Sequence, residues 1–167
     1  MNNMKKYAFY ISGNSGRLFK FIEQADTEVH NQIKIVISDK MIPEELRKLL
    51  LEKGIRYLTY EYSTLKGNNN REKNRSLSDL ILKQLVEFGI NYMFSFGGHI
   101  LSGDLLKKYC WRLINFHPAI LPMYPGRKAI DQAVEHGNTL LVGNTAHFMD
   151  EGVDAPTGDM ACPVPQL

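Results

Sequence analysis

The hydrophobic residues of this chain fall into short runs that are separated by polar, glycine-rich or proline-rich segments. Several runs are almost continuously apolar and rich in β-branched or aromatic residues, which is typical of strands buried on both faces. The predicted strands are Tyr7–Ile11, Ile33–Ile37, Tyr57–Tyr60, Asn91–Phe96 and Trp111–Asn115, with a last one within Leu140–His147. A single domain over residues 1–167, apparently short at its C-terminus, is expected to contain them all.

Helical spacing of apolar residues follows most of these runs. The helices are expected around Leu18–Ile22, over Glu44–Lys53, around Leu77–Phe88, over Leu105–Tyr109 and over Ala129–Glu135. Pro43 suits the first turn of its helix, and Gly54 is placed to end it. The segment Lys66–Asn74 is polar and rich in asparagine, so it is predicted to be a loop.

Strands and helices that alternate in this way predict an α/β fold. We expect a Rossmann-like, mostly parallel sheet with helices on both faces. Such sheets bind ligands beyond the carboxyl ends of their strands. The residues expected at that edge are Gly13, Gly16, Gly97, Gly98, Asn115, His117 and His147.

Composition narrows the class of protein only moderately. Hydrophobic residues make up 44% and charged residues 23%, and a net charge of +2 gives no reason to expect nucleic acid or an acidic membrane as partner. Two cysteines, Cys110 and Cys162, are too few for a disulfide framework and favour a reduced setting. The apolar run near the N-terminus is too short for a signal peptide or a membrane span, so a cytoplasmic protein is expected.

The polar residues at the predicted edge each allow a structural and a functional interpretation. Ser12–Gly16 fits a plain turn as well as a phosphate site at a helix N-terminus, and Arg17 favours the anion. His117 fits a buried structural histidine as well as a site residue, whereas His147, within an apolar run, favours the structural role. The spacing of these histidines, with no cysteine or carboxylate cluster, argues against a metal.

Two segments in the second half of the chain together resemble the signatures of folate-dependent formyltransferases. INFHPAILPMYPG, which ends at Gly126, resembles that family's pattern Asn-x-His-Pro-Ser-Leu-Leu-Pro-x-Tyr-x-Gly. GNTAHFMDEGVD, which ends at Asp154, resembles its pattern Gly-x-Thr-x-His-x-x-x-x-x-x-Asp. FGGHILSGDLL resembles the folate-binding segment, and the resemblance covers nearly all of residues 6–160.

The resemblance implies transfer of a formyl group from N10-formyltetrahydrofolate, as co-substrate, to a primary amine. The implied catalytic residues are Asn115, His117 and Asp154. The residues implied to bind the folate are Gly98, His99, Ile100 and Leu101, and those implied to hold a phosphate of the acceptor are Asn14, Ser15, Gly16 and Arg17. No metal is implied. The family's cis peptide bond corresponds to Leu121-Pro122.

These residue types suit the chemistry, because negative charge grows on the formyl oxygen when an amine attacks. Asn115 and a protonated His117 are donors for that oxygen, and Asp154 is a partner that keeps the imidazole charged and relays a proton. The Ser-Gly-Asn loop and Leu-Pro-x-Tyr-Pro-Gly resemble those of the family members that formylate glycinamide ribonucleotide, and this resemblance implies that acceptor, in purine synthesis. A nucleotide-linked amino sugar and an inactive folate-binding pseudo-enzyme stay open, as does a homodimer.

Overall fold

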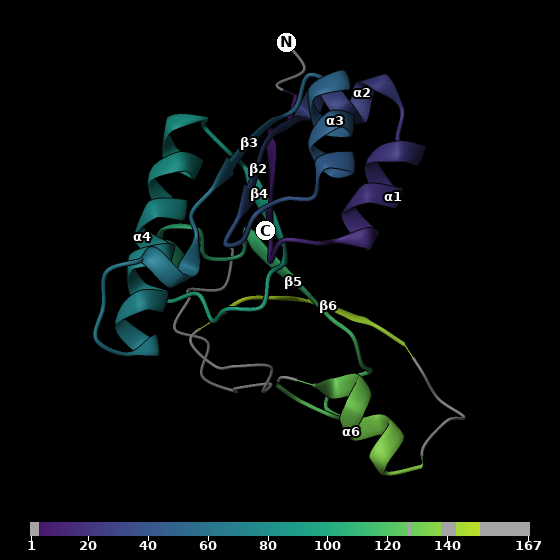
Figure 1. The fold of residues 1–167 in the computed structure, drawn as a ribbon, viewed down its shortest axis with the longest axis vertical. Helices are drawn as coiled ribbons and strands as arrows, with labels where there is room; N and C mark the ends of the chain where they lie inside the picture. The colour runs from purple at the N-terminus through teal and green to yellow at the C-terminus, as the bar shows by residue number, and fades with distance from the viewer. Residues whose placement is uncertain (1–3, 127, 138–142, 151–167) are drawn as a thin grey trace, which may run out of the picture.

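The computed structural model describes residues 4–126, 128–137 and 143–150 (Figure 1). Their strands form one six-stranded sheet in the order β3-β2-β1-β4-β5-β6. The strands are β1 (Tyr7–Ile11), β2 (Ile33–Ser38), β3 (Arg56–Thr59), β4 (Tyr92–Phe96), β5 (Leu113–His117) and β6 (Thr145–Phe148). All pairs are parallel except β5 with β6, which is antiparallel. The predicted mostly parallel α/β fold is confirmed.

Helices cover both faces of this sheet, as Figure 1 shows. They are α1 (Gly16–Gln24), α2 (Thr27–Gln32), α3 (Glu44–Glu52), α4 (Asn70–Glu87), α5 (Asp104–Lys108), α6 (Ala129–Glu135) and a 3₁₀ turn, η1 (Tyr62–Thr64). Helices α1 and α3 pack on one face and α4 and α5 on the other, whereas α6 stands apart beyond one end of the sheet.

The alternation of side chains along β1 accounts for the two layers of core. Ala8 and Tyr10 point into the core beneath α4 and α5, and Phe9 and Ile11 point into the core beneath α1 and α3. Successive residues of a strand face opposite sides of a sheet, so a strand that is apolar at every position must be covered on both. The continuous run Tyr7–Ile11 is therefore the central strand of the sheet.

Helix α4 begins at Asn70, so the predicted loop over Lys66–Asn74 is wrong in its second half. Asn69 caps the helix, because its side-chain oxygen accepts from the backbone N–H of Glu72 at 2.9 Å. The Glu72 carboxylate accepts in turn from the backbone N–H of Asn68 at 2.8 Å. This reciprocal capping lets a polar, asparagine-rich segment start a helix.

Strand β5 lies two residues later than the predicted Trp111–Asn115. Trp111 has a φ of 59°, a left-handed conformation that cannot continue a strand. The ladder therefore begins at Leu113 and runs through His117. Asn115 is thus a middle residue of the strand and His117 its last, whereas the strand was expected to end at Asn115 and His117 to follow it.

Three further features differ from the sequence-based account. Helix α2 was not predicted, and Asp26 caps it by accepting from the backbone N–H of Val29 at 2.9 Å. Cys110, expected as a reduced thiol, is disulfide-bonded in the structure. The last strand begins at Thr145, and part of the predicted Leu140–His147 run lies outside the described residues.

Within the described ranges, no helix is long and apolar enough to cross a membrane.

Candidate active site

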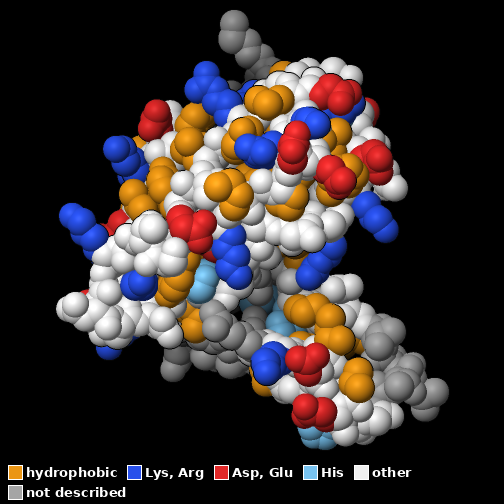
Figure 2. Space-filling view, in the orientation of Figure 1, with side chains coloured by type: hydrophobic (Ala, Val, Ile, Leu, Met, Phe, Trp, Pro, Cys, Tyr) orange, Lys and Arg blue, Asp and Glu red, His pale blue; other side chains and the backbone are white. Residues whose placement is uncertain are grey.

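A cavity of about 590 Å³ opens beside the carboxyl ends of β4 and β5. Figure 2 shows the hollow between the body of the molecule and the segment that carries α6, with histidine side chains inside it. It is lined by most of the residues expected to meet at this edge of the sheet, namely Gly97, Gly98, Asn115, His117 and His147. Gly13 and Gly16, which were expected there as well, are not among the described residues that line it.

His117 is both a buried, hydrogen-bonded histidine and a residue of the cavity wall, the two roles that its sequence context left open. Its side chain is buried, with 3% of the residue exposed, and it lines the cavity. Its Nε2 lies 2.8 Å from the carbonyl oxygen of Tyr124. Because a carbonyl only accepts, Nε2 carries a proton and donates to it. Nδ1 is then the nitrogen whose protonation decides the charge of the ring.

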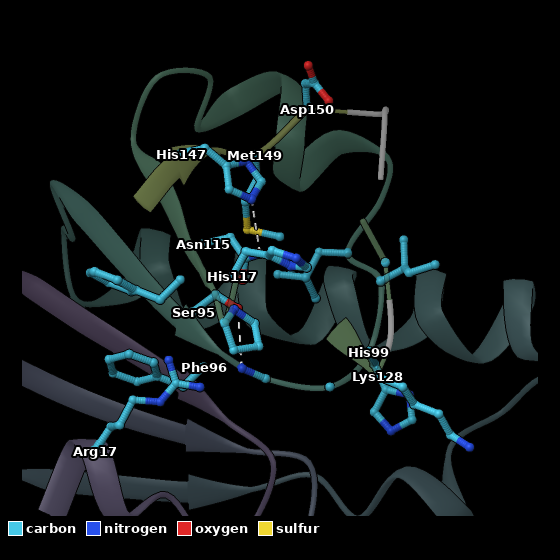
Figure 3. A pocket seen from close by; sticks show the side chains of 17 residues that line it. Arg17, Ser95, Phe96, His99, Asn115, His117, Lys128, His147, Met149 and Asp150 are labelled. Atoms are coloured by element: carbon cyan, nitrogen blue, oxygen red, sulfur yellow. Dashed lines mark hydrogen bonds between the residues drawn. The ribbon is translucent and has the colours of Figure 1, made fainter. Parts of the chain in front are cut away.

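Asn115 and His147 face each other across the antiparallel pair β5–β6. The Nδ2 of Asn115 lies 3.2 Å from Nε2 of His147, and Nδ1 of His147 lies 3.1 Å from the carbonyl oxygen of Phe148. The carbonyl requires a proton on Nδ1, so Nε2 of a neutral ring accepts from the amide. His147 therefore orients Asn115 and lines the cavity (Figure 3), which corrects the purely structural role favoured for it.

The proline-rich wall after β5 is held by Thr145, the threonine of the Gly-x-Thr-x-His pattern, to which the sequence analysis assigned no role. Its hydroxyl donates to the carbonyl of Ala119 at 2.7 Å and accepts from the backbone N–H of Leu121 at 2.9 Å. The Leu121-Pro122 peptide bond is cis, as the family resemblance implies. Thr145 pairs with His117 in the β5–β6 ladder, so one strand secures both the catalytic candidate and the wall behind it.

Arg17 is the one residue of the predicted anion loop that lines the cavity. Its guanidinium carbon lies 5.4 Å from the centre of the Phe96 ring, and Figure 3 shows the two side chains together at one side of the site. The hydroxyl of Ser15 accepts from the backbone N–H of Leu18 at 3.3 Å and so caps α1. Asn14, Ser15 and Gly16 are not among the described lining residues, although they precede Arg17 directly.

The segment predicted to bind folate borders the cavity over its full length, from Gly98 to Leu101. Leu101 is 2% exposed and its side chain packs in the core, so it borders the cavity through its backbone. Ile100 is 46% exposed and supplies an apolar surface. Gly97, just before it, must be glycine, because a Cβ there would lie 1.9 Å from the ring of Tyr10.

Among the described residues that line the cavity, one is acidic. Asp150 lines the cavity, whereas Asp154, the third catalytic candidate, lies outside the described residues. Among the residues that the structure describes, no three His, Cys, Asp or Glu side chains are grouped to hold a metal ion. The described cavity offers hydrogen bonding and charge from an amide, imidazoles, the Asp150 carboxylate and the cations Arg17 and Lys128.

The family of the protein follows from a comparison of its sequence with family models. The model described as "Formyl transferase" matches residues 5–163. The chain belongs to the formyl transferase family. The match spans both strand-borne candidates, Asn115 and His117, and the whole described cavity.

Two curated relatives and one solved structure show where this formyl transferase chain stands. It is 35% identical over 152 residues to the human "Trifunctional purine biosynthetic protein adenosine-3", covering 90% of this chain and 14% of that protein. It is 26% identical over 153 residues to the "Phosphoribosylglycinamide formyltransferase" of Bacillus subtilis, covering 90% of this chain and 74% of the relative. The crystal structure of phosphoribosylglycinamide formyltransferase from Streptococcus pneumoniae superposes with a TM-score of 0.71 at 28% identity, covering 90% and 77% of the two chains.

Proposed function

We propose that this chain transfers a formyl group from N10-formyltetrahydrofolate to the amine of glycinamide ribonucleotide, a step of purine synthesis. The observation that carries the proposal is the cavity in which Asn115 and His117 face the segment Gly98–Leu101. Both B. subtilis and S. pneumoniae relatives are named for phosphoribosylglycinamide. The proposed partners are small molecules, with neither nucleic acid nor membrane involved.

The described residues suit a flat heterocycle with a charged extension. The cavity volume of about 590 Å³ lies in the usual range for small-molecule sites. Backbone groups of the Gly98–Leu101 segment can pair with the edge of a pterin, and Ile100 offers an apolar surface beside them. His99 and Lys128 also line the cavity and add polar and basic groups to it. We therefore place the co-substrate along Gly98–Leu101.

Asn115 is proposed to stabilise the oxygen of the reacting formyl group. The bound co-substrate supplies the formyl carbon that the amine of the acceptor attacks, and negative charge then grows on the formyl oxygen. An asparagine amide has two N–H groups, and the contact with His147 engages one side of it. An amide fixed in this way donates without reorganising, which is how preformed donors lower the barrier to acyl transfer.

His117 is proposed as the second donor and as the residue that handles the proton. Its Nε2 donates to Tyr124, so the ring acts on the reaction through Nδ1. A protonated Nδ1 donates to the developing oxyanion more strongly than a neutral group does. We propose that Asp154 keeps this ring charged and accepts the proton of the attacking amine through water. The tetrahedral adduct then collapses, the bond between the formyl carbon and N10 breaks, and N10 takes up a proton, so that tetrahydrofolate leaves and the amine keeps the formyl group.

Arg17 is proposed to hold the phosphate of the acceptor, together with the backbone N–H groups of Asn14, Ser15 and Gly16. A guanidinium suits a phosphate because it offers several donors in one plane. The start of α1 adds N–H groups of the kind that bind anions. The amine of the acceptor then approaches Asn115 and His117 from the side of Arg17, which lines the same cavity.

The test is to incubate the protein with N10-formyltetrahydrofolate and a panel of amines, and to follow release of the folate spectroscopically. We expect rapid release with glycinamide ribonucleotide only. Turnover only with a nucleotide-linked amino sugar would reassign the acceptor. Binding of the folate without turnover of any amine would identify a pseudo-enzyme, and no binding at all would refute the proposal.

We also propose a cytoplasmic location and a single catalytic domain over residues 1–167. Reducing conditions in that compartment would open the disulfide of Cys110, so activity should persist in excess reductant if the assignment holds. A homodimer is a separate prediction, which sedimentation of the active protein tests. Loss of activity on reduction would contradict the cytoplasmic assignment.

A further inference from the structure

We infer that Asp39, a buried carboxylate outside the cavity wall, positions His99 and the adjoining glycines for binding of the folate co-substrate. Asp39 follows β2 and is 0% exposed. This inference rests on the proposed function, because it assigns a positioning role within the same site. Asp39 is not among the described residues that line the cavity, so it acts through its neighbours.

One carboxylate oxygen of Asp39 collects donors from β1 and the residue that follows it. Oδ2 accepts from the hydroxyl of Tyr10 and from the hydroxyl of Ser12, the latter at 2.8 Å. Oδ1 is buried and has no hydrogen-bond partner within the described part of the chain. Burial and the negative charge of Asp39 raise the pKa of Tyr10 well above its usual value of 10.0, so this phenol stays a donor.

The same donors are tied to the segment that borders the cavity. Ser12 gives its proton to Asp39, and its oxygen accepts from the backbone N–H of Gly98 at 2.5 Å. Gly97 lies against the ring of Tyr10, at a distance that leaves no room for a side chain. The end of β4 therefore rests on the two residues that hold the Asp39 carboxylate.

His99 completes the cluster from the cavity side. Its Nε2 lies 3.7 Å from Oδ2 of Asp39, and its side chain is 17% exposed. Its ring stacks on Tyr62, with ring centres 3.5 Å apart and planes at 9°. Tyr62 is itself fixed, because its backbone N–H donates to the Asp39 carbonyl at 2.9 Å and its hydroxyl donates to Asn74 at 2.7 Å.

The negative charge of Asp39 gives its contact with His99 an electrostatic contribution in addition to packing. A buried carboxylate without a cation is costly, and His99 is its ion-pair partner among the described residues. The contact between Oδ2 of Asp39 and Nε2 of His99, at 3.7 Å, therefore holds the His99 ring at the cavity wall. Because Asn115 and His117 lie on β5, loss of Asp39 should weaken binding of the folate without altering the chemical step.

The experiment measures tetrahydrofolate binding by calorimetry and steady-state kinetics for wild type, Asp39→Asn, His99→Asn and the double variant. Asparagine keeps the size of Asp39 and an acceptor for Tyr10, but removes the charge. We expect Asp39→Asn to raise the Kd for tetrahydrofolate and the KM for the co-substrate roughly 10-fold, with kcat within about twofold, as loss of a charge-assisted contact does. Asp79→Asn, an exposed carboxylate on α4, is the control and should change neither.

The double variant separates positioning from a general loss of stability. Because Asp39 acts through His99 as well as through Ser12, Asp39→Asn should have a smaller effect on Kd in the His99→Asn background than in wild type. Independent, multiplying effects would overturn the inference, as would an unchanged Kd in Asp39→Asn while wild type binds. Failure of wild type to bind tetrahydrofolate would instead refute the proposed function. If Asp39→Asn does not fold, Ser12→Ala decides: an unchanged Kd overturns the inference.

Discussion

The amide of Asn115 lies 3.2 Å from Nε2 of His147, across the one antiparallel strand pair of the described sheet. This contact joins the strand that carries the catalytic candidates to the strand that closes the sheet. It gives His147 a role in the reaction that does not require contact with the substrate. Its removal should affect turnover through the orientation of Asn115.

Replacing His147 by Phe keeps a ring in β6 but removes the acceptor for Asn115. We expect kcat to fall about 10-fold, the scale of one lost hydrogen bond, while Asn115→Ala loses about 10²-fold. Steady-state kinetics at saturating co-substrate check this. Asp79→Asn, a change of an exposed carboxylate on α4, is the control and should leave kcat unchanged. Equal activity of His147→Phe and wild type would show that Asn115 needs no such support.

Replacing His117 by Ala removes the proposed second donor. We expect turnover to fall by about 10²-fold or more, as losing a donor to an oxyanion does. Calorimetry with tetrahydrofolate should still show binding, because the folate segment belongs to a different strand end. Near-normal turnover would exclude the assigned role, and loss of folate binding would show that His117 serves the pocket rather than the chemistry.

Arg17→Ala tests the proposed phosphate site. The KM for glycinamide ribonucleotide should rise by about 10-fold or more, because a charge-assisted hydrogen bond to phosphate is lost. The affinity for tetrahydrofolate should stay the same. Lys20→Ala, an exposed cation on the same helix, is the control for a change in overall charge. An effect confined to folate binding would assign Arg17 to the other ligand.

Asp154→Asn tests the third catalytic candidate, which lies outside the described residues. We expect a loss of about 10²-fold or more in kcat, the scale of a positioned acid–base group. The measurement is single-turnover formyl transfer with both substrates bound. If wild type is already nearly inactive and the variant differs little from it, the protein is a folate-binding pseudo-enzyme and not an active formyltransferase.

Stability at alkaline pH tests the Tyr10–Asp39 pair. The pKa of Tyr10 is raised in the folded protein by burial and by Asp39, so the folded state holds this proton more tightly than the unfolded chain does. The contribution is fully present below pH about 10, the usual tyrosine value, and is lost as the pH rises further. Above that pH the unfolding free energy of wild type should fall about 1.4 kcal/mol per pH unit more steeply than that of Tyr10→Phe. Equal slopes in urea titrations would contradict the buried pair.

The sequence predicted the elements whose signals are local. The strand Tyr7–Ile11 and the helix Ala129–Glu135 have the predicted bounds. A continuous apolar run defines the strand, and a glycine follows shortly after the end of each element. The start of α4 was also accessible, since Asn69 and Glu72 have the spacing of a reciprocal cap. The loop was predicted instead because the segment Lys66–Asn74 is polar and rich in asparagine.

The parts that the sequence could not predict depend on pairing between distant segments. His147 reaches Asn115 only because β6 pairs antiparallel with β5, and no local pattern fixes that register. The residues around Asp39 come from three other parts of the chain. Tyr10 and Ser12 belong to one part, Tyr62 to a second and His99 to a third. Such contacts come from the topology of the sheet, and Asp39 alone looks like any residue of a polar turn.

Transfer of a labelled formyl group is the most direct test of the central claim. The purified chain is mixed with N10-formyltetrahydrofolate, labelled in its formyl group, and glycinamide ribonucleotide, and the products are separated and identified by mass. The account predicts that the label moves to the amine of the ribonucleotide in wild type and in Asp79→Asn, but not in a variant that combines Asn115→Ala with His117→Ala. Label that stays on the folate, or that moves equally well without Asn115 and His117, would contradict it.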